Sequence, residues 1–395
     1  MAVDVAPVTS GSDLHRFVTF PWKVYRGDPT WVPPLIRDEK KLLSPGRHPF
    51  HDHGEIRCFL ARAAGGGGKA RVVGRVAAIR NTAYEEFHRE NVGFFGFFEC
   101  LPTWAHLARD GVAATPEAIT KALVDAVRGW LGDRGLARFL GPMNPSTNET
   151  CGLLIDGFDD PPMVMMTYNP AEYAGLLQSA GLVKAKDMVA YIMADVDPPD
   201  ALLKRVEAVV GRSGVKVRTL DKKNMREEIR RIQKVYNGAW EKNWGFVPMT
   251  QPELDHMAKE LMPIVEPEYV AFVEKDGEPI GFCLALPDFN MALRHANGRL
   301  FPFGLLKILW YSRKIDRLRV LALGLLPEYR KLGIDQLLYL QLWRSGRRKG
   351  IRQGEFSWIL EDNAPMRTAV EKMGSKVAKT YRIYEGSAAG APDAP

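Results

Sequence analysis

GLLPEYRKLGID, residues 324–335, is the stretch that decides the fold of this 395-residue chain. A leucine-rich run from Arg319 leads into it and predicts a buried strand, and the apolar periodicity of residues 335–348 predicts a helix directly after it. The first turn of a helix carries unpaired amide donors and the positive end of the helix dipole. Such a loop can bind phosphate oxygens through its main chain, and here Gly333 permits close approach while Arg330 adds a cation.

In this setting, residues 330–335 resemble the signature of the GNAT superfamily of acyl-CoA-dependent N-acyltransferases, which is R/Q-x-x-G-x-G/A after a strand. The match holds at Arg330 and Gly333, whereas Asp335 stands where the signature has a small residue. A carboxylate at Asp335 would repel a diphosphate if it pointed inward and would cap the helix if it pointed away, and we favour the cap.

The resemblance implies that the loop holds the pyrophosphate of acetyl-CoA or another acyl-CoA. It also implies that main-chain groups after the strand bind the pantetheine arm and that an Asn lies near the thiol. The cofactor-binding residues implied are Leu325, Leu326, Arg330, Lys331, Leu332, Gly333, Ile334, Asp335 and Asn363.

Acyl transfer in this superfamily is direct, so a base must deprotonate the acceptor amine and an acid must protonate the thiolate. The family often has a Tyr four residues before the glycine that ends the last helix, and here that position is Val370. The acid is then Tyr381, Tyr384 or water, or it is dispensable. The two tyrosines are also consistent with half-buried strand positions without a catalytic role. The candidate bases are Glu361, Glu328 and Glu241.

Residues 237–250, NGAWEKNWGFVPMT, lie where the GNAT plan builds its acceptor site. Trp240, Glu241 and Trp244 are therefore predicted to line that site, although a packed loop anchored by the two tryptophans remains open. Asn148 belongs to a polar cluster that could add a second wall or form an Asx-rich turn. The acceptor expected is a small-molecule or peptide amine.

The same order of elements occurs twice along the chain. Hairpins are predicted at residues 55–79 and 269–287, and each is followed by a central strand, a helix, another strand, a last helix and a strand pair. We therefore expect two GNAT-like mixed-sheet α/β sandwich domains in tandem, at residues 1–197 and 198–386, before a disordered tail at 387–395. The first half has no R-x-x-G at the corresponding loop and is not expected to bind CoA.

The amino-acid composition restricts the kinds of ligand and partner that the chain is expected to bind. The net charge of +7 is spread along the chain, which favours an anionic cofactor and gives no support to nucleic acid. The four cysteines are isolated in apolar runs and are predicted to be buried thiols, while His51 and His53 lack the matching ligands of a metal site. No secretory signal or spanning run is evident, so we expect a cytoplasmic monomer or homodimer.

Two alternatives remain from the sequence. The departure at Asp335 and the missing Tyr are also consistent with an inactive GNAT-fold scaffold. Residues 300–314, LFPFGLLKILWYSRK, form a strongly apolar run with cations at its end. It is predicted as a helix packed between the two domains, and the alternatives are a membrane-surface helix or the guard of a channel for a long acyl chain.

Overall fold

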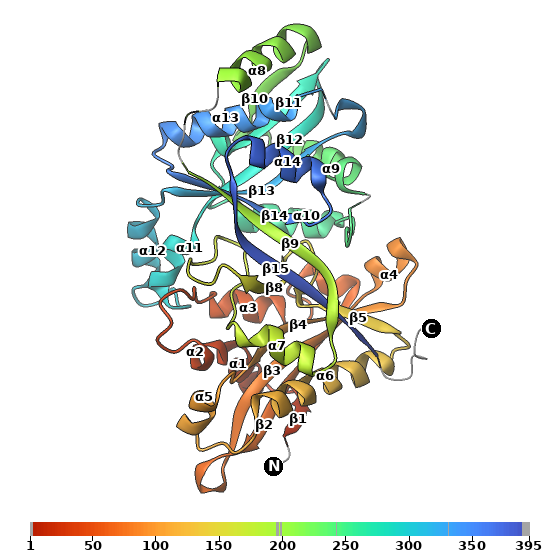
Figure 1. Cartoon of the computed structure of the whole chain (residues 1–395), viewed down its shortest axis with the longest axis vertical. Coiled ribbons are helices and arrows are strands. Elements are labelled where there is room, and N and C mark those ends of the chain that lie inside the picture. The colour runs from red at the N-terminus through yellow and green to blue at the C-terminus, as the bar shows by residue number, and fades with distance from the viewer. Residues whose placement is uncertain (1–2, 195–196, 198–199, 242, 331, 389–395) are drawn as a thin grey trace. The chain divides into compact units, whose positions relative to one another are not determined.

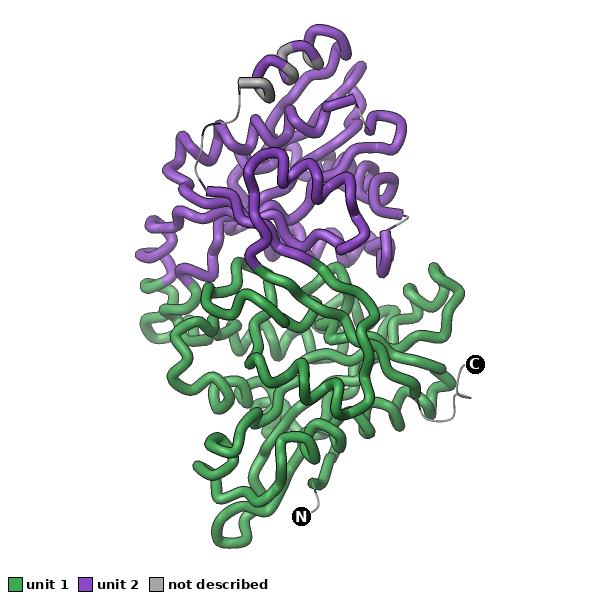
Figure 2. Tube along the Cα trace, in the orientation of Figure 1, with its two compact units in different colours: residues 1–188, 293–307, 379–395 green, residues 189–292, 308–378 purple. Residues whose placement is uncertain are grey.

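The computed structural model describes residues 3–194, 197, 200–241, 243–330 and 332–388. Its contacts divide the chain into two compact units, neither of which is continuous in sequence (Figure 2). Unit 1 comprises Met1–Met188, Leu293–Lys307 and Lys379–Pro395, and unit 2 comprises Val189–Ala292 and Ile308–Ala378.

Unit 1 is built on a mixed sheet in which neighbours are antiparallel except for the parallel pair β4 and β5. In sheet order the strands are β1 (Asp4–Pro7), β2 (Gly54–Ala64), β3 (Ala70–Asn81), β4 (Val92–Cys100), β5 (Arg138–Gly141) and β15 (Lys376–Ser387), and β8 (Leu153–Asp156) also pairs with β15. The helices are α1 (Gly11–Thr19), α2 (Pro21–Val24), α3 (Ile36–Leu42), α4 (Thr82–His88), α5 (Trp104–Arg109), α6 (Pro116–Gly132) and α7 (Glu172–Ser179). A separate small ribbon joins β6 (Met143–Asn144) to β7 (Thr150–Cys151).

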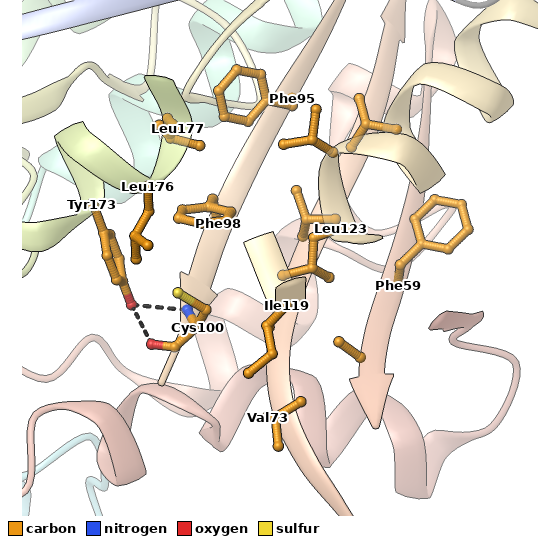
Figure 3. Packing of buried hydrophobic residues seen from close by; sticks show 14 of the residues in the cluster. Phe59, Val73, Phe95, Phe98, Cys100, Ile119, Leu123, Tyr173, Leu176 and Leu177 are labelled. Atoms are coloured by element: carbon orange, nitrogen blue, oxygen red, sulfur yellow. Dashed lines mark hydrogen bonds between the residues drawn. The ribbon is translucent and has the colours of Figure 1, made fainter. Parts of the chain in front are cut away.

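The core of unit 1 lies between α6 and the sheet, with α7 beside it (Figure 3). Helix α6 begins at Pro116 because the Thr115 side chain accepts the Ala118 amide and caps it. Its apolar stripe then packs on β3 and β4. From α7, the Tyr173 hydroxyl bonds both main-chain groups of Cys100, at 2.9 Å to its amide and 2.8 Å to its carbonyl (Figure 3).

Unit 2 repeats this plan with strands in the order β9 (Val183–Ala194), β14 (Gln353–Leu360), β13 (Arg317–Leu325), β12 (Glu278–Pro287), β11 (Val270–Lys275) and β10 (Lys216–Thr219). Its helices are α8 (Asp200–Ser213), α9 (Met225–Trp240), α10 (Gln251–Leu261), α11 (Asn290–Leu293), α13 (Asp335–Arg348) and α14 (Ala364–Lys372). Helix α12 (Gly304–Ser312) begins in unit 1 and ends in unit 2. The β11–β12 turn has positive φ at both Asp276 and Gly277, as the Asp-Gly pair predicts for a two-residue hairpin.

The predicted order of elements is found in both halves, but the terminal strand pairs are wrong. One long strand follows each last helix, β9 after α7 and β15 after α14 (Figure 1). These strands are also exchanged, because the end of β9 lies in unit 2 and residues 379–387 of β15 lie in unit 1 against β5 and β8. Each runs for 12 residues without the turn residues that a hairpin needs.

The two units defined by contacts therefore do not coincide with domains separated by a boundary between residues 197 and 198. In the predicted tail, Ser387 ends β15 and Ala388 is buried, and residues 389–395 lie outside the described part of the chain. All four cysteines are buried, as predicted. Burial raises the pKa of the Cys58 and Cys283 thiols to about 12.

Candidate functional site

Strands β13 and β14 form an opening in the sheet of unit 2. They pair in parallel only from Arg317 to Val320 on β13 and from Gln353 to Phe356 on β14, although both strands continue beyond these residues. A bulge after Val320 shifts the register of β13 against β12. Beyond the last pair, the main-chain groups of the two strands are not bonded to each other, and this unpaired stretch is the opening.

The loop after β13 leads from this opening to the start of α13. Gly333 has a φ of 77°, a conformation that favours glycine, and the buried Ile334 side chain anchors the loop. Within the described part of the chain, the amides of Leu332, Gly333 and Ile334 donate to no main-chain carbonyl. The structure therefore has amides without a main-chain acceptor next to a helix terminus, as an anion site of this kind requires, and Lys331 lies outside the described residues.

Asp335 is the first residue of α13, and Ile334 occupies the N-cap position. The prediction that Asp335 is the cap is therefore wrong by one position. Its carboxylate nonetheless accepts the amides of Asp335 and Gln336, while burial raises its pKa. The carboxylate thus satisfies part of the helix terminus itself, and a diphosphate would meet it there.

Arg330 is tied to the main chain. Its guanidinium donates to the Leu325 carbonyl at 3.2 Å and to the Ala239 carbonyl at 2.6 Å, which joins the loop to the end of α9. The Leu326 amide donates to the Ile280 carbonyl of β12 at 2.9 Å. Because main-chain groups alternate along a strand, the Leu325 amide faces the opposite edge, toward the opening.

Trp240 lies at the end of α9, against the sheet. Its ring stacks on Tyr236 with centroids 4.9 Å apart and approaches Gly324 of β13. Glu241 is exposed directly after the helix, and Trp244 is half-buried in the following loop. The fourth predicted acceptor residue, Asn148, lies in unit 1, where its amide donates to the Ser146 hydroxyl at 3.2 Å.

The predicted catalytic residues lie in different environments. Glu361 directly follows β14, and Glu328 is exposed in the loop after β13. Tyr381 is fully buried in unit 1, paired with Leu154 of β8. Asn363 caps α14, since its side-chain oxygen accepts the Met366 amide at 3.3 Å.

The sequence interpretation missed a buried polar cluster beside the opening. Arg319 donates to the Ser357 hydroxyl at 2.8 Å, and that hydroxyl donates to Glu355 at 2.5 Å. Arg319 and Glu355 are opposite each other in the parallel pair, and both are buried. One Glu355 oxygen, Oε2, has no hydrogen-bond partner among the described residues. The sequence feature that could have indicated this cluster is the presence of charged residues within two apolar strand segments.

The corresponding place in unit 1 is filled by its own chain. Strands β4 and β5 also pair over a short stretch, from Val92 to Phe94 on β4. The Asn144 side chain then accepts the Phe97 amide at 2.7 Å. A Cβ atom at Gly96 would lie 1.9 Å from the Met143 carbonyl oxygen, so main chain is packed directly on β4.

An apolar cavity of about 80 Å³ lies in unit 2 under the C-terminal half of α13. Its lining includes Val320, Phe356, Leu342 and Trp343. On α13 the lining begins at Tyr339, about one helical turn after the helix start, and Val320 and Phe356 are the last parallel pair of β13 and β14. No group of three or more His, Cys, Asp or Glu side chains suited to a metal occurs among the described residues.

No protein-family model matches the chain. It is 32% identical over 391 residues to the bacterial ceramide synthase of Caulobacter vibrioides, covering 97% of each chain. It is also 32% identical over 382 residues to protein YghO of Escherichia coli, covering 95% of this chain and 93% of YghO.

Two solved structures match almost the whole chain. A tandem GNAT protein from the clavulanic acid biosynthesis pathway has a TM-score of 0.56 at 12% identity, covering 99% of this chain and 100% of its own. A GCN5-related N-acetyltransferase from Sphaerobacter thermophilus has a TM-score of 0.53 at 13% identity, covering 99% of this chain and 98% of its own. At these identities they bear on the fold alone, and they confirm the predicted tandem GNAT-like α/β architecture.

Proposed function

We propose, since the chain belongs to the family of the bacterial ceramide synthase and YghO, that it transfers an acyl group from acyl-CoA to the amine of a sphingoid base. The observation that carries this proposal is 32% identity to the ceramide synthase along 97% of both chains. A ceramide is an N-acylated sphingoid base, so this relative's name matches the reaction type expected for a GNAT fold. The acceptor proposed is therefore an amine with a long apolar tail, and the acyl group a long one.

The acyl-CoA is proposed to bind unit 2. The diphosphate would lie against the amides of Leu332 to Ile334 and the start of α13, and the pantetheine arm would enter the opening and bond the Leu325 amide. Arg330 would hold the loop in shape through its two carbonyl contacts. In unit 1 the Asn144 side chain and the Met143 main chain occupy the equivalent place, which supports the prediction that unit 1 binds no CoA.

The reaction forms the amide C–N bond and breaks the C–S bond of the thioester. The amine proton is proposed to pass to the Ser357 hydroxyl oxygen as the hydroxyl proton moves to Glu355, along the 2.5 Å bond between them. Glu361 and Glu328 remain alternative bases. Water is proposed as the acid for the thiolate, because Tyr381 is fully buried in unit 1.

The test is thiol release and amide formation by the full chain with palmitoyl-CoA and sphinganine, followed by mass spectrometry. Glu355→Gln should lower kcat by about 100-fold or more with unchanged palmitoyl-CoA affinity, and Glu361→Gln and Glu328→Gln are parallel arms. If one of those two loses activity and Glu355→Gln keeps it, the proton route is wrong.

The cofactor loop has its own test. Leu332 is 56% exposed and Val377 is 48% exposed, so glutamate at either place should be tolerated by the fold. Leu332→Glu should weaken CoA binding several-fold by repelling the diphosphate, and Val377→Glu should leave it unchanged. CoA binding combined with no amine-dependent thiol release would favour the scaffold alternative. Absence of any acyl-CoA binding would refute the acyltransferase proposal.

A further inference from the structure

Exposed apolar side chains are concentrated in one short segment. Eleven large hydrophobic residues of the described chain are exposed, and six of them lie within residues 301–310. Single exposed hydrophobic residues are common on soluble proteins, but a contiguous group marks an interaction surface. The six are Phe301, Phe303, Leu305, Leu306, Leu309 and Trp310.

Four of these six side chains lie on helix α12. Gly304 and Ile308, one helical turn apart, are its buried positions, so a single narrow face is attached to the protein. A Cβ atom at Gly304 would lie 1.7 Å from the Arg299 carbonyl oxygen, which shows how closely the helix start is packed. The remaining faces present leucine and tryptophan to solvent. The predicted helix is present, and these side chains on it are exposed.

The charge around the segment has one sign. Arg299, Lys307, Arg313 and Lys314 are exposed, and residues 289–315 contain no Asp or Glu. The Lys314 ammonium lies 5.2 Å from the centre of the Tyr311 ring, at the helix end. Apolar and aromatic side chains surrounded by cations fit the interface of an anionic lipid bilayer.

A second copy of this chain fits less well. In a two-fold interface the same patch faces itself, so these cations would meet like charges with no carboxylate of the segment to neutralise them. We infer that α12 and the residues before it dock this protein on anionic phospholipid membranes, with the apolar side chains in the interface and the cations at the headgroups. This inference does not depend on the proposed function.

The test is co-sedimentation of the full chain with vesicles of phosphatidylglycerol and phosphatidylethanolamine, compared with phosphatidylcholine alone. The protein should pellet with the anionic vesicles. Trp310→Gln should lower the partition coefficient by about tenfold, whereas Trp104→Gln should not change it. The two tryptophans are matched, at 61% and 62% exposure on α12 and α5.

The contribution of the cations to membrane binding is tested with two triple variants. The first replaces cations of the segment, Lys307→Gln/Arg313→Gln/Lys314→Gln. The second replaces exposed cations elsewhere, Lys222→Gln/Lys223→Gln/Arg226→Gln. The first should abolish the preference for anionic vesicles and the second should keep it. Equal losses in the two tryptophan variants would overturn the inference. So would an absence of vesicle binding combined with a dimer, seen by sedimentation equilibrium, that Trp310→Gln dissociates.

Discussion

Replacing Gly324 by alanine tests the contact that joins α9 to the central strand of unit 2. The added Cβ would lie 2.4 Å and 2.6 Å from two atoms of the Trp240 ring and 3.0 Å from the Ala239 Cβ. Carbon atoms pack best at about 3.5–4.0 Å, so the overlap with the ring is about 1 Å. The ring cannot simply retreat, because Tyr236 stacks on it and Phe282 lies 5.7 Å away.

We expect Gly324→Ala to lower the free energy of unfolding by about 1–3 kcal/mol, measured as a lower urea midpoint by circular dichroism. Gly354→Ala on the adjacent strand is the matched control, since its Cβ would meet nothing within 4 Å. That variant should be as stable as the parent or slightly more stable. In a Trp240→Leu background the cost of Gly324→Ala should nearly vanish. Equal stability of the two alanine variants, or a cost that survives in this background, would refute the reasoning.

Three other changes address charge and packing. Asp335→Asn keeps an acceptor for the helix amides but removes a negative charge from the proposed diphosphate site, so CoA should bind about fivefold tighter by calorimetry. Because the pKa of Asp335 is raised, the affinity of the parent protein for CoA should increase as the pH falls. A variant that binds CoA no more tightly than the parent would contradict this reasoning. Burial raises the pKa of Glu99 from 4.5 to about 7. The free energy of unfolding of the parent should therefore fall by up to about 1.4 kcal/mol per pH unit as the pH rises between these two values. In melting curves from pH 4.5 to 7, Glu99→Gln should remove this loss, whereas the control Glu117→Gln, at an exposed position, should keep it. Gly96→Ala would place its Cβ against main-chain atoms and should lower the free energy of unfolding by about 3 kcal/mol. Gly93→Ala would meet only the end of the Leu131 side chain and should be less destabilising. The reverse order in urea unfolding would contradict the packing described.

The local sequence pattern predicted the loop between β13 and α13. The apolar run before Pro327, Gly333 and the periodicity after it identified a strand, a loop and a helix, and α13 has the predicted bounds of Asp335–Arg348. Asp335 was misplaced by one position because side-chain propensity does not resolve a helix boundary that finely.

Features that depend on which strands are neighbours could not be predicted in this way. The buried cluster of Arg319, Ser357 and Glu355 exists because β13 and β14 are parallel in one register, and neither strand alone reveals it. The exchange of β9 and β15 is also non-local, since the alternation of a strand is the same whichever neighbour it pairs with. The loop could thus be found from sequence, whereas the proposed proton route required the fold.

The exchange of β15 has a consequence for how the protein is made. Residues 138–141 leave the ribosome long before residues 384–387, yet these two segments are hydrogen-bonded partners in one sheet. Until residues 384–387 have been synthesised, β5 has an unpaired edge of the kind that invites aggregation. The half synthesised first should therefore mature last, and removal of residues 379–388 by a protease should unfold unit 1 before it affects unit 2.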